Sequence, residues 1–146
     1  MSKVIAILAS DLHLSATPPP ARAGEPDWFE AMARPLRELW ELQAAYTTSY
    51  CLPPIIYAGD IFDRWNSSPE VINFALDELP IGHAIYGNHD LPNHAPSELH
   101  RSAYATLIKA GRVRPLDEGT IFPDSNLHVF PFPWGKEVGP CPIEYA

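Results

Sequence analysis

The chain has 146 residues and a formal net charge of −8, from 10 lysines and arginines against 18 aspartates and glutamates. This length suits one domain, and an apolar share of 46% is typical of a soluble globular protein. No apolar run reaches the ~18 residues of a membrane span, and the first residues lack the features of a signal peptide. We therefore expect a single domain over residues 1–146, cytoplasmic and without a membrane partner.

The acidic balance disfavours long-range attraction to a phosphate backbone. It does not exclude nucleic acid as a substrate, because bound cations or a local basic patch reverse the sign of the field at the site. The two cysteines, Cys51 and Cys141, provide neither a disulfide framework nor a zinc cluster. We expect both to be free thiols in a reducing compartment.

Three short apolar runs are typical of strands in a parallel sheet. The first, residues 4–9, is rich in β-branched side chains and is predicted to be buried on both faces. The second and third cover residues 54–58 and 81–86. Each of the three runs leads into a group of polar residues.

A helical pattern follows the first run, after a stretch at 15–26 that is too rich in proline to predict regular structure. Its apolar stripe extends from Trp28 to Trp40 and is expected to pack in the core. Pro35 interrupts the pattern, which predicts a kink or two short helices that meet near Arg34.

Two more helices are indicated by capping residues. Ser67 or Ser68 can cap the second helix, which Pro80 ends, and Ser97 is expected to cap a third that Gly111 closes. The tail shows short strand patterns at 112–113, 120–122 and 127–130. The alternation predicts an α/β fold with a mostly parallel central sheet flanked by helices.

Polar clusters stand directly after each of the three predicted strands. They are Asp11 and His13, then Asp60, Asp63 and Arg64, then Asn88, His89 and Asp90. Ligands bind at the carboxyl ends of strands in open α/β sheets. Carboxylate, imidazole and amide donors together suit Mn²⁺, Fe²⁺ or Zn²⁺. In an extended stretch Asp11 and His13 would point to the same side and hold one cation, while the two oxygens of Asp60 would allow it to bridge two.

These clusters resemble the first three motifs of the calcineurin-like metallophosphoesterases, in the same order. The matching segments are Asp11-x-His13, Gly59-Asp60-x-x-Asp63-Arg64 and Gly87-Asn88-His89-Asp90. The resemblance implies that Asp11 and His13 bind a first divalent metal, that Asp60 bridges and that Asn88 binds a second, with Mn²⁺ as the first choice and Fe²⁺ or Zn²⁺ as alternatives. It also implies that His89 is the general acid, and that Asp63, Arg64 and Asp90 orient ligands or substrate.

Each motif also has a purely structural interpretation. Gly59 and Gly87 are common turn residues, and Arg64 is a plausible ion-pair partner of Asp63. His83 alternates within a strand pattern and is expected to be structural. The remaining histidines match no motif and are expected on the surface or in the core: His94, His100 and His128. His94 is nevertheless close enough in sequence to Asn88 to reach the same cleft.

The residues of these motifs are most similar to those of SbcD-like DNA repair nucleases and their phage relatives. This implies a phosphodiesterase or DNA exonuclease, with a small-molecule phosphatase or cyclic-nucleotide phosphodiesterase as the runner-up. A third hypothesis is a non-catalytic module that binds a partner.

The family also has a lone later histidine and a Gly-His-x-His motif, and this sequence contains no Gly-His-x-His. We therefore expect a domain truncated on its carboxyl side, which is half of a four-layer metallophosphoesterase sandwich. Such a chain should bind metals weakly and turn over slowly. Its open sheet edge would favour a homodimer or a partner subunit.

Overall fold

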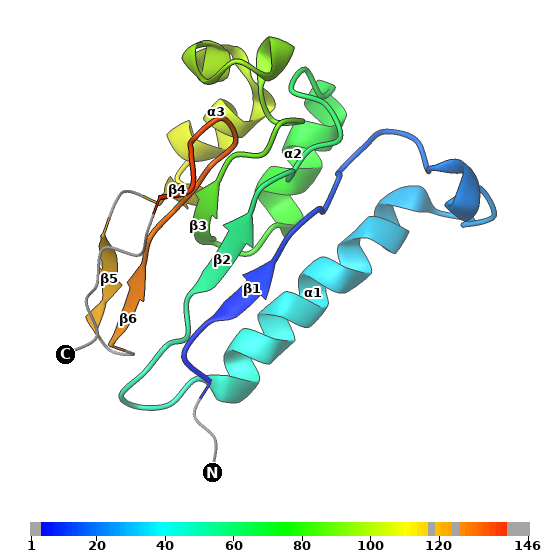
Figure 1. Ribbon diagram of the computed structural model, residues 1–146. Coiled ribbons are helices and arrows are strands. Elements are labelled where there is room, and N and C mark those ends of the chain that lie inside the picture. Colours follow the sequence, from blue (N-terminus) through cyan, green and yellow to red (C-terminus); the bar gives the residue numbers. More distant parts are fainter. Residues whose placement is uncertain (1–3, 117–118, 124–125, 140–146) are drawn as a thin grey trace.

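The computed structural model describes residues 4–116, 119–123 and 126–139. Four short strands form a parallel sheet in the order β1-β2-β3-β4 (Figure 1). They are β1 (Ile7–Ala9), β2 (Ile55–Ala58), β3 (Gly82–Ile85) and β4 (Val113–Pro115). The predicted α/β class with a parallel central sheet is confirmed.

Three α-helices connect the strands: α1 (Trp28–Tyr46), α2 (Pro69–Glu78) and α3 (Ala103–Lys109). Because the strands follow one another in chain order, right-handed crossovers place all three helices on the same face. Neighbouring helices contact one another, α1 with α2 and α2 with α3. The sheet side chains in this core alternate along the strands, and they include Ile55, Tyr57, Ala84 and Val113.

Side-chain caps fix where the helices begin. Ser68 accepts a hydrogen bond from the Val71 amide at 3.4 Å, which confirms the second of the two predicted caps for α2. The predicted start of the third helix at Ser97 is wrong. Residues Pro96–Arg101 form a 3-10 helix, and α3 begins only after Ser102, whose hydroxyl accepts from the Ala105 amide at 3.1 Å.

Of the two outcomes predicted at Pro35, the division into two short helices is wrong, because α1 runs through it as a single helix of 19 residues. A proline inside a helix costs about 3 kcal/mol. Ala31, Met32 and Leu36 lie on both sides of the proline and are all buried, so their packing holds the helix together. Propensity alone does not include this tertiary contribution.

Two apolar segments are less buried than expected. The stripe of α1 does not extend to Trp40, whose exposed fraction is 63%. The prediction that residues 4–9 are buried on both faces is wrong as well, since Ile5 is 42% and Leu8 73% exposed. The reason is position: β1 is the edge strand of the described sheet, and Leu8 faces away from the helices.

Short elements complete the fold. The stretch expected to be irregular at 15–26 contains one 3-10 turn at Pro20–Arg22, and a second 3-10 turn follows at Pro92–His94. The tail strands β5 (Thr120–Phe122) and β6 (Leu127–Val129) pair as an antiparallel hairpin, as their patterns predict. The Phe122 ring meets the His83 ring edge-on at 4.7 Å, so this hairpin contacts the sheet face opposite the helices.

Among the described residues, no helix is both long and apolar enough to cross a membrane. Cys51 is buried and free, as expected, whereas Cys141 lies outside the described residues.

Candidate metal centre

The loops that follow β1 and β2 are joined by backbone hydrogen bonds. The amides of Asp11 and His13 donate to the carbonyls of Gly59 at 3.3 Å and Asp60 at 3.1 Å. One residue further, the Leu14 amide donates to Ile61 at 2.9 Å. Parallel pairing therefore continues beyond the strands, and it brings the first two polar clusters side by side.

Asp11, His13 and Asp60 all adopt left-handed backbone angles, with φ of 54°, 45° and 51°. This conformation is unusual for residues other than glycine, and it occurs at sites where the surrounding structure holds the strain. The extended geometry assumed for Asp11 and His13 is therefore wrong. Their side chains nevertheless converge, with 3.8 Å between Asp11 Oδ1 and His13 Nε2.

The loop after β3 approaches Asp60 closely because residue 87 is glycine. The His89 amide donates to Asp60 Oδ1 at 3.0 Å. A Cβ on Gly87 would lie 2.0 Å from that same oxygen, which is an impossible contact. Gly87 is therefore required by this approach and is more than a turn residue.

Asp90 lies beneath these loops and is fully buried. Its carboxylate accepts backbone amides from Ile61 at 3.4 Å, Phe62 at 3.1 Å and Gly87 at 3.0 Å. Burial raises the pKa of Asp90, and the nearby Asp60 carboxylate raises it further, against the opposing effect of the three amide bonds. Asp90 thus joins the second and third loops, and the orienting role that the motif implied for it stays a prediction.

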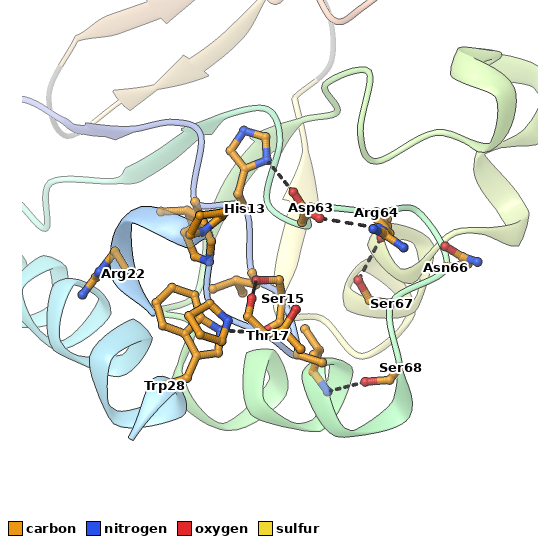
Figure 2. Close-up of a pocket in the computed structure, with 17 residues that line it drawn as sticks. His13, Ser15, Thr17, Arg22, Trp28, Asp63, Arg64, Asn66, Ser67 and Ser68 are labelled. Carbon is orange, nitrogen blue, oxygen red and sulfur yellow. Dashed lines mark hydrogen bonds and ion pairs between the residues drawn. The ribbon is translucent and has the colours of Figure 1, made fainter. Parts of the chain in front are cut away.

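A cavity of about 860 Å³ opens beside the first two loops (Figure 2). Its lining includes both His13 and Asp63, which belong to the polar clusters. A ligand at the cluster would therefore have room to extend in this direction.

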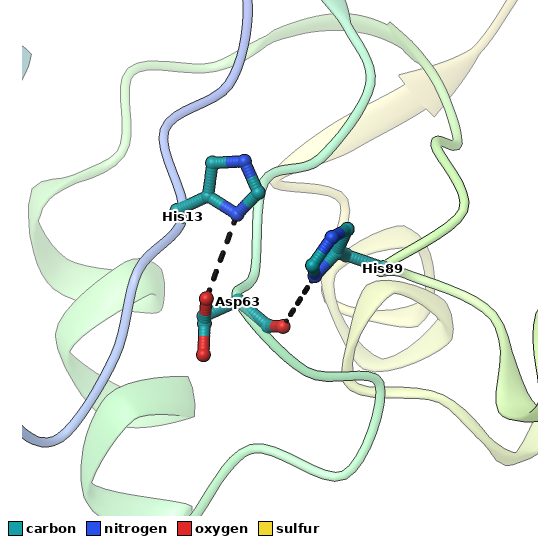
Figure 3. A group of neighbouring side chains, drawn as sticks. All are labelled: His13, Asp63 and His89. Atoms are coloured by element: carbon teal, nitrogen blue, oxygen red, sulfur yellow. Dashed lines mark hydrogen bonds and ion pairs between the residues drawn. The ribbon is translucent and has the colours of Figure 1, made fainter. Parts of the chain in front are cut away.

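Two overlapping groups of side chains could hold metal ions. His13, Asp63 and His89 form one, and Asp11, His13 and Asp60 form the other, with the ligand atoms of each group within 4.8 Å of one another. Figure 3 shows the first group: His13 Nδ1 lies 3.7 Å from Asp63 Oδ1, and the His13 and His89 rings stand perpendicular at 4.8 Å. Imidazole and carboxylate donors at this separation suit the divalent metals predicted from the sequence.

His89 has one ring nitrogen committed to the protein. Its Nδ1 lies 2.7 Å from the Asp63 backbone carbonyl (Figure 3). A carbonyl can only accept, so Nδ1 carries a proton and Nε2 is the nitrogen left for chemistry or for a metal. The geometry fixes which atom of His89 can act.

Asn88 and Arg64, which were also predicted for the site, are chain neighbours of the cluster residues His89 and Asp63. Asn88 is partly buried next to His89, and its backbone carbonyl lies 2.9 Å from Nδ1 of the exposed His94. Arg64 is 81% exposed, with its Nε 3.6 Å from Asp63 Oδ2. This ion pair matches the structural interpretation of Arg64, and it leaves the guanidinium open to solvent.

The sequence placed Asp63 among orienting residues, whereas the structure brings its carboxylate directly to His13. The spacing of three residues from Asp60 was the available signal, but the bend of the loop decides where that carboxylate points. His83 is half-buried against Phe122, consistent with a structural role. His100 and His128 are exposed.

A parallel sheet with histidines and carboxylates converging at its carboxyl edge defines an α/β protein with a candidate metal centre. Residues 6–141 match the model of the calcineurin-like phosphoesterase family, so the chain belongs to that family. Its members are metal-dependent phosphoester hydrolases, and the donor set found here fits a divalent metal centre. No curated protein gives a significant match to the chain, and the SbcD-like branch stays a prediction.

Proposed function

We propose that the chain hydrolyses phosphodiesters with two bound divalent cations, Mn²⁺ first, and that DNA ends are among its substrates. The observation that carries this proposal is the convergence of donors from three strand ends. In this proposal Asp11 and His13 would hold the first cation and Asp60 would be shared with the second. Asn88 would help to hold the second cation, as the motif Gly87-Asn88-His89-Asp90 implies. Asp63 is a further candidate ligand.

The charge of the site supports a cation requirement. Three carboxylates, from Asp11, Asp60 and Asp63, surround His13 in a chain of net charge −8. Such a field repels a phosphate group unless bound cations reverse it. When bound, two divalent ions would supply an activated water and neutralise charge on the phosphoryl oxygens.

The chain's own residues would supply the remaining steps. The fixed Nδ1 of His89 leaves Nε2 to hold the proton for the departing oxygen. The exposed Arg64 guanidinium can contact a substrate phosphate. The buried Asp90 carboxylate holds the loops after β2 and β3 together through hydrogen bonds to Phe62 and Gly87.

The variant His89→Asn tests both the hydrolysis of phosphodiesters and the role of His89 as the general acid. We expect wild-type protein to hydrolyse bis(p-nitrophenyl) phosphate only with Mn²⁺, and the variant to lose about 100-fold or more in kcat, the usual contribution of a general acid. Mn²⁺ affinity, measured by calorimetry, should be retained. His100→Asn is the matched control, because His100 is exposed and outside the cluster.

Two other outcomes of this experiment would change the role assigned to His89. Unchanged turnover in His89→Asn would remove the general-acid role. A parallel loss of Mn²⁺ affinity would make His89 a metal ligand, which its membership of the His13 and Asp63 group also permits.

A second candidate function is a binding module without turnover. The observation that favours it is the exposed apolar side of β1, where Leu8 is 73% exposed on the edge strand. We propose a second copy of the chain as the partner, because two such edges can pair symmetrically.

A further inference from the structure

The cavity beside the metal centre is large enough to hold much of a substrate. Its volume of about 860 Å³ is within the range of small-molecule pockets. It lies between the loop that follows β1 and the segment before α2, as Figure 2 shows with the labelled residues Ser15, Thr17, Asn66 and Ser67. His13 and Asp63 line it, so the cavity and the metal cluster are continuous.

One wall is aromatic and held in place without any ligand. Trp28 Nε1 donates to the Ser15 carbonyl at 2.8 Å, which fixes the indole edge. The Arg22 guanidinium lies 5.2 Å from the Trp28 ring and is paired with Glu25 at 2.9 Å. Prolines 18–20 extend this wall with rigid apolar rings. A flat ring would meet a preformed surface here.

Polar groups line the cavity from both segments, Thr17 from the loop after β1 and Asn66, Ser67 and Ser68 from the segment before α2. Ser67 and Ser68 are already committed, to the Arg64 carbonyl and the Val71 amide. In the described part of the chain, the side chains of Thr17 and Asn66 have no hydrogen-bond partner, and both line the cavity. They can therefore bond the edge of a polar ring or a sugar hydroxyl.

We propose that this cavity binds the base and sugar of a nucleotide whose phosphate lies at the metal centre, an inference that rests on the proposed function. The match is chemical: a flat ring against Trp28 and the prolines, hydrogen bonds to Thr17 and Asn66, and a phosphate near the cluster and Arg64. The nucleotide is either a free ester or the end of a strand.

Binding without metal tests this inference separately from turnover, because each probe carries one phosphate and the repulsion by the acidic cluster is common to all three. The probes are thymidine 5′-monophosphate, ribose 5-phosphate and inorganic phosphate, titrated calorimetrically into the full chain. We expect thymidine monophosphate to bind at least about tenfold more tightly than either of the other two, from the stacking contribution of one base. Equal affinity for ribose 5-phosphate or phosphate would overturn the inference.

A filled cavity gives the second readout. Ala16 lines the cavity and is exposed, so Ala16→Trp should weaken thymidine monophosphate binding about tenfold or more. Ala45→Trp places the same ring on the exposed, distant end of α1 and is the matched control. Unaltered binding in Ala16→Trp, or an equal loss in both variants, would overturn the inference.

Kinetics with Mn²⁺ separate the inference from the proposed function. Thymidine 5′-(p-nitrophenyl phosphate) and methyl p-nitrophenyl phosphate differ only in that a methyl group replaces the nucleoside. Ala16→Trp should raise the KM of the thymidine ester, relative to the KM of the methyl ester, about tenfold. An unchanged ratio contradicts the cavity's role while the proposed function stands. If neither ester is hydrolysed, the proposed function fails, and metal-free binding still decides the cavity. A short oligothymidylate then assigns the source: tighter binding than the mononucleotide indicates a strand end, and equal binding a free ester.

Discussion

At the scale of single residues, Gly87 decides how closely the second and third ligand loops approach. Gly87→Ala would force its new methyl group into Asp60 Oδ1, 2.0 Å away. We expect this variant to fold and to lose at least about tenfold in Mn²⁺ affinity, a cost of ~1.4 kcal/mol, because Asp60 must move. Calorimetric titration with Mn²⁺ measures the loss.

Gly24→Ala is the control for that substitution. Gly24 has no atom within 4 Å of a built Cβ, so its variant should bind Mn²⁺ as the wild type does. Equal Mn²⁺ affinities for Gly87→Ala and wild type would show that metal binding does not depend on the position of Asp60 in the structure.

The sequence predicted which residues gather at this site better than it predicted how they do so. Asp11 and His13 were expected to meet through extended backbone, yet both adopt left-handed angles. Propensity cannot foresee strain that depends on hydrogen bonds from Asp11 and His13 to a second loop. The contact of Asp63 with His13 has the same origin, since it depends on the bend of a loop.

At the scale of elements, the β5–β6 hairpin contacts the sheet through His83 and Phe122. Burial, together with the nearby Arg114 charge, lowers the pKa of His83 below its usual 6.5. The unfolded chain therefore binds this proton more readily than the folded chain does. The stability contributed here is complete above pH 6.5 and is lost as the pH falls through the window between 6.5 and the lowered pKa.

NMR titration of the His83 ring checks this contact. We expect a midpoint below 6.5 in the wild type and a shift toward 6.5 in Phe122→Ala, because removal of the ring re-exposes the imidazole. Ile121→Ala, at the exposed neighbouring position, should leave the midpoint in place. A wild-type midpoint at or above 6.5 would contradict the burial of the His83 ring beneath the hairpin.

The presence of the strands and helices was predictable from the period of the apolar residues and the length of each segment. The residues at which the helices begin and end were not. The continuation of α1 through Pro35 and the start of α3 after Ser102 are decided by packing and by local hydrogen bonds. Trp40 is exposed although its neighbour Leu39 packs against the core, so its exposure depends on which face of α1 it occupies. These are tertiary effects, and a single sequence carries little signal for them.

At the scale of the whole molecule, the exposed apolar side of β1 that carries Leu8, called the open face below, predicts self-association. Leu8→Ser removes an apolar side chain that is 73% exposed, and burial of such a side chain is worth roughly 1.5–3 kcal/mol. We expect sedimentation to show a concentration-dependent dimer for the wild type. The variant should have a dissociation constant at least about tenfold higher.

Leu42→Ser, an exposed substitution on the helical side, is the control and should leave the dimer intact. A wild-type monomer at all concentrations would reject the open face as an interface between copies. The predicted truncation on the carboxyl side concerns a missing Gly-His-x-His, and it stays a prediction that the described residues do not test.

The proposed phosphodiesterase activity depends most on Asp60, which is expected to bridge two cations. The direct measurement is the rate of bis(p-nitrophenyl) phosphate hydrolysis with Mn²⁺, compared between wild type, Asp60→Asn and the exposed control Asp77→Asn. We predict slow, Mn²⁺-dependent turnover that falls at least about 100-fold in Asp60→Asn and is retained in Asp77→Asn. Turnover that persists in Asp60→Asn, or that does not depend on Mn²⁺, would contradict a bridged metal pair as the source of the activity.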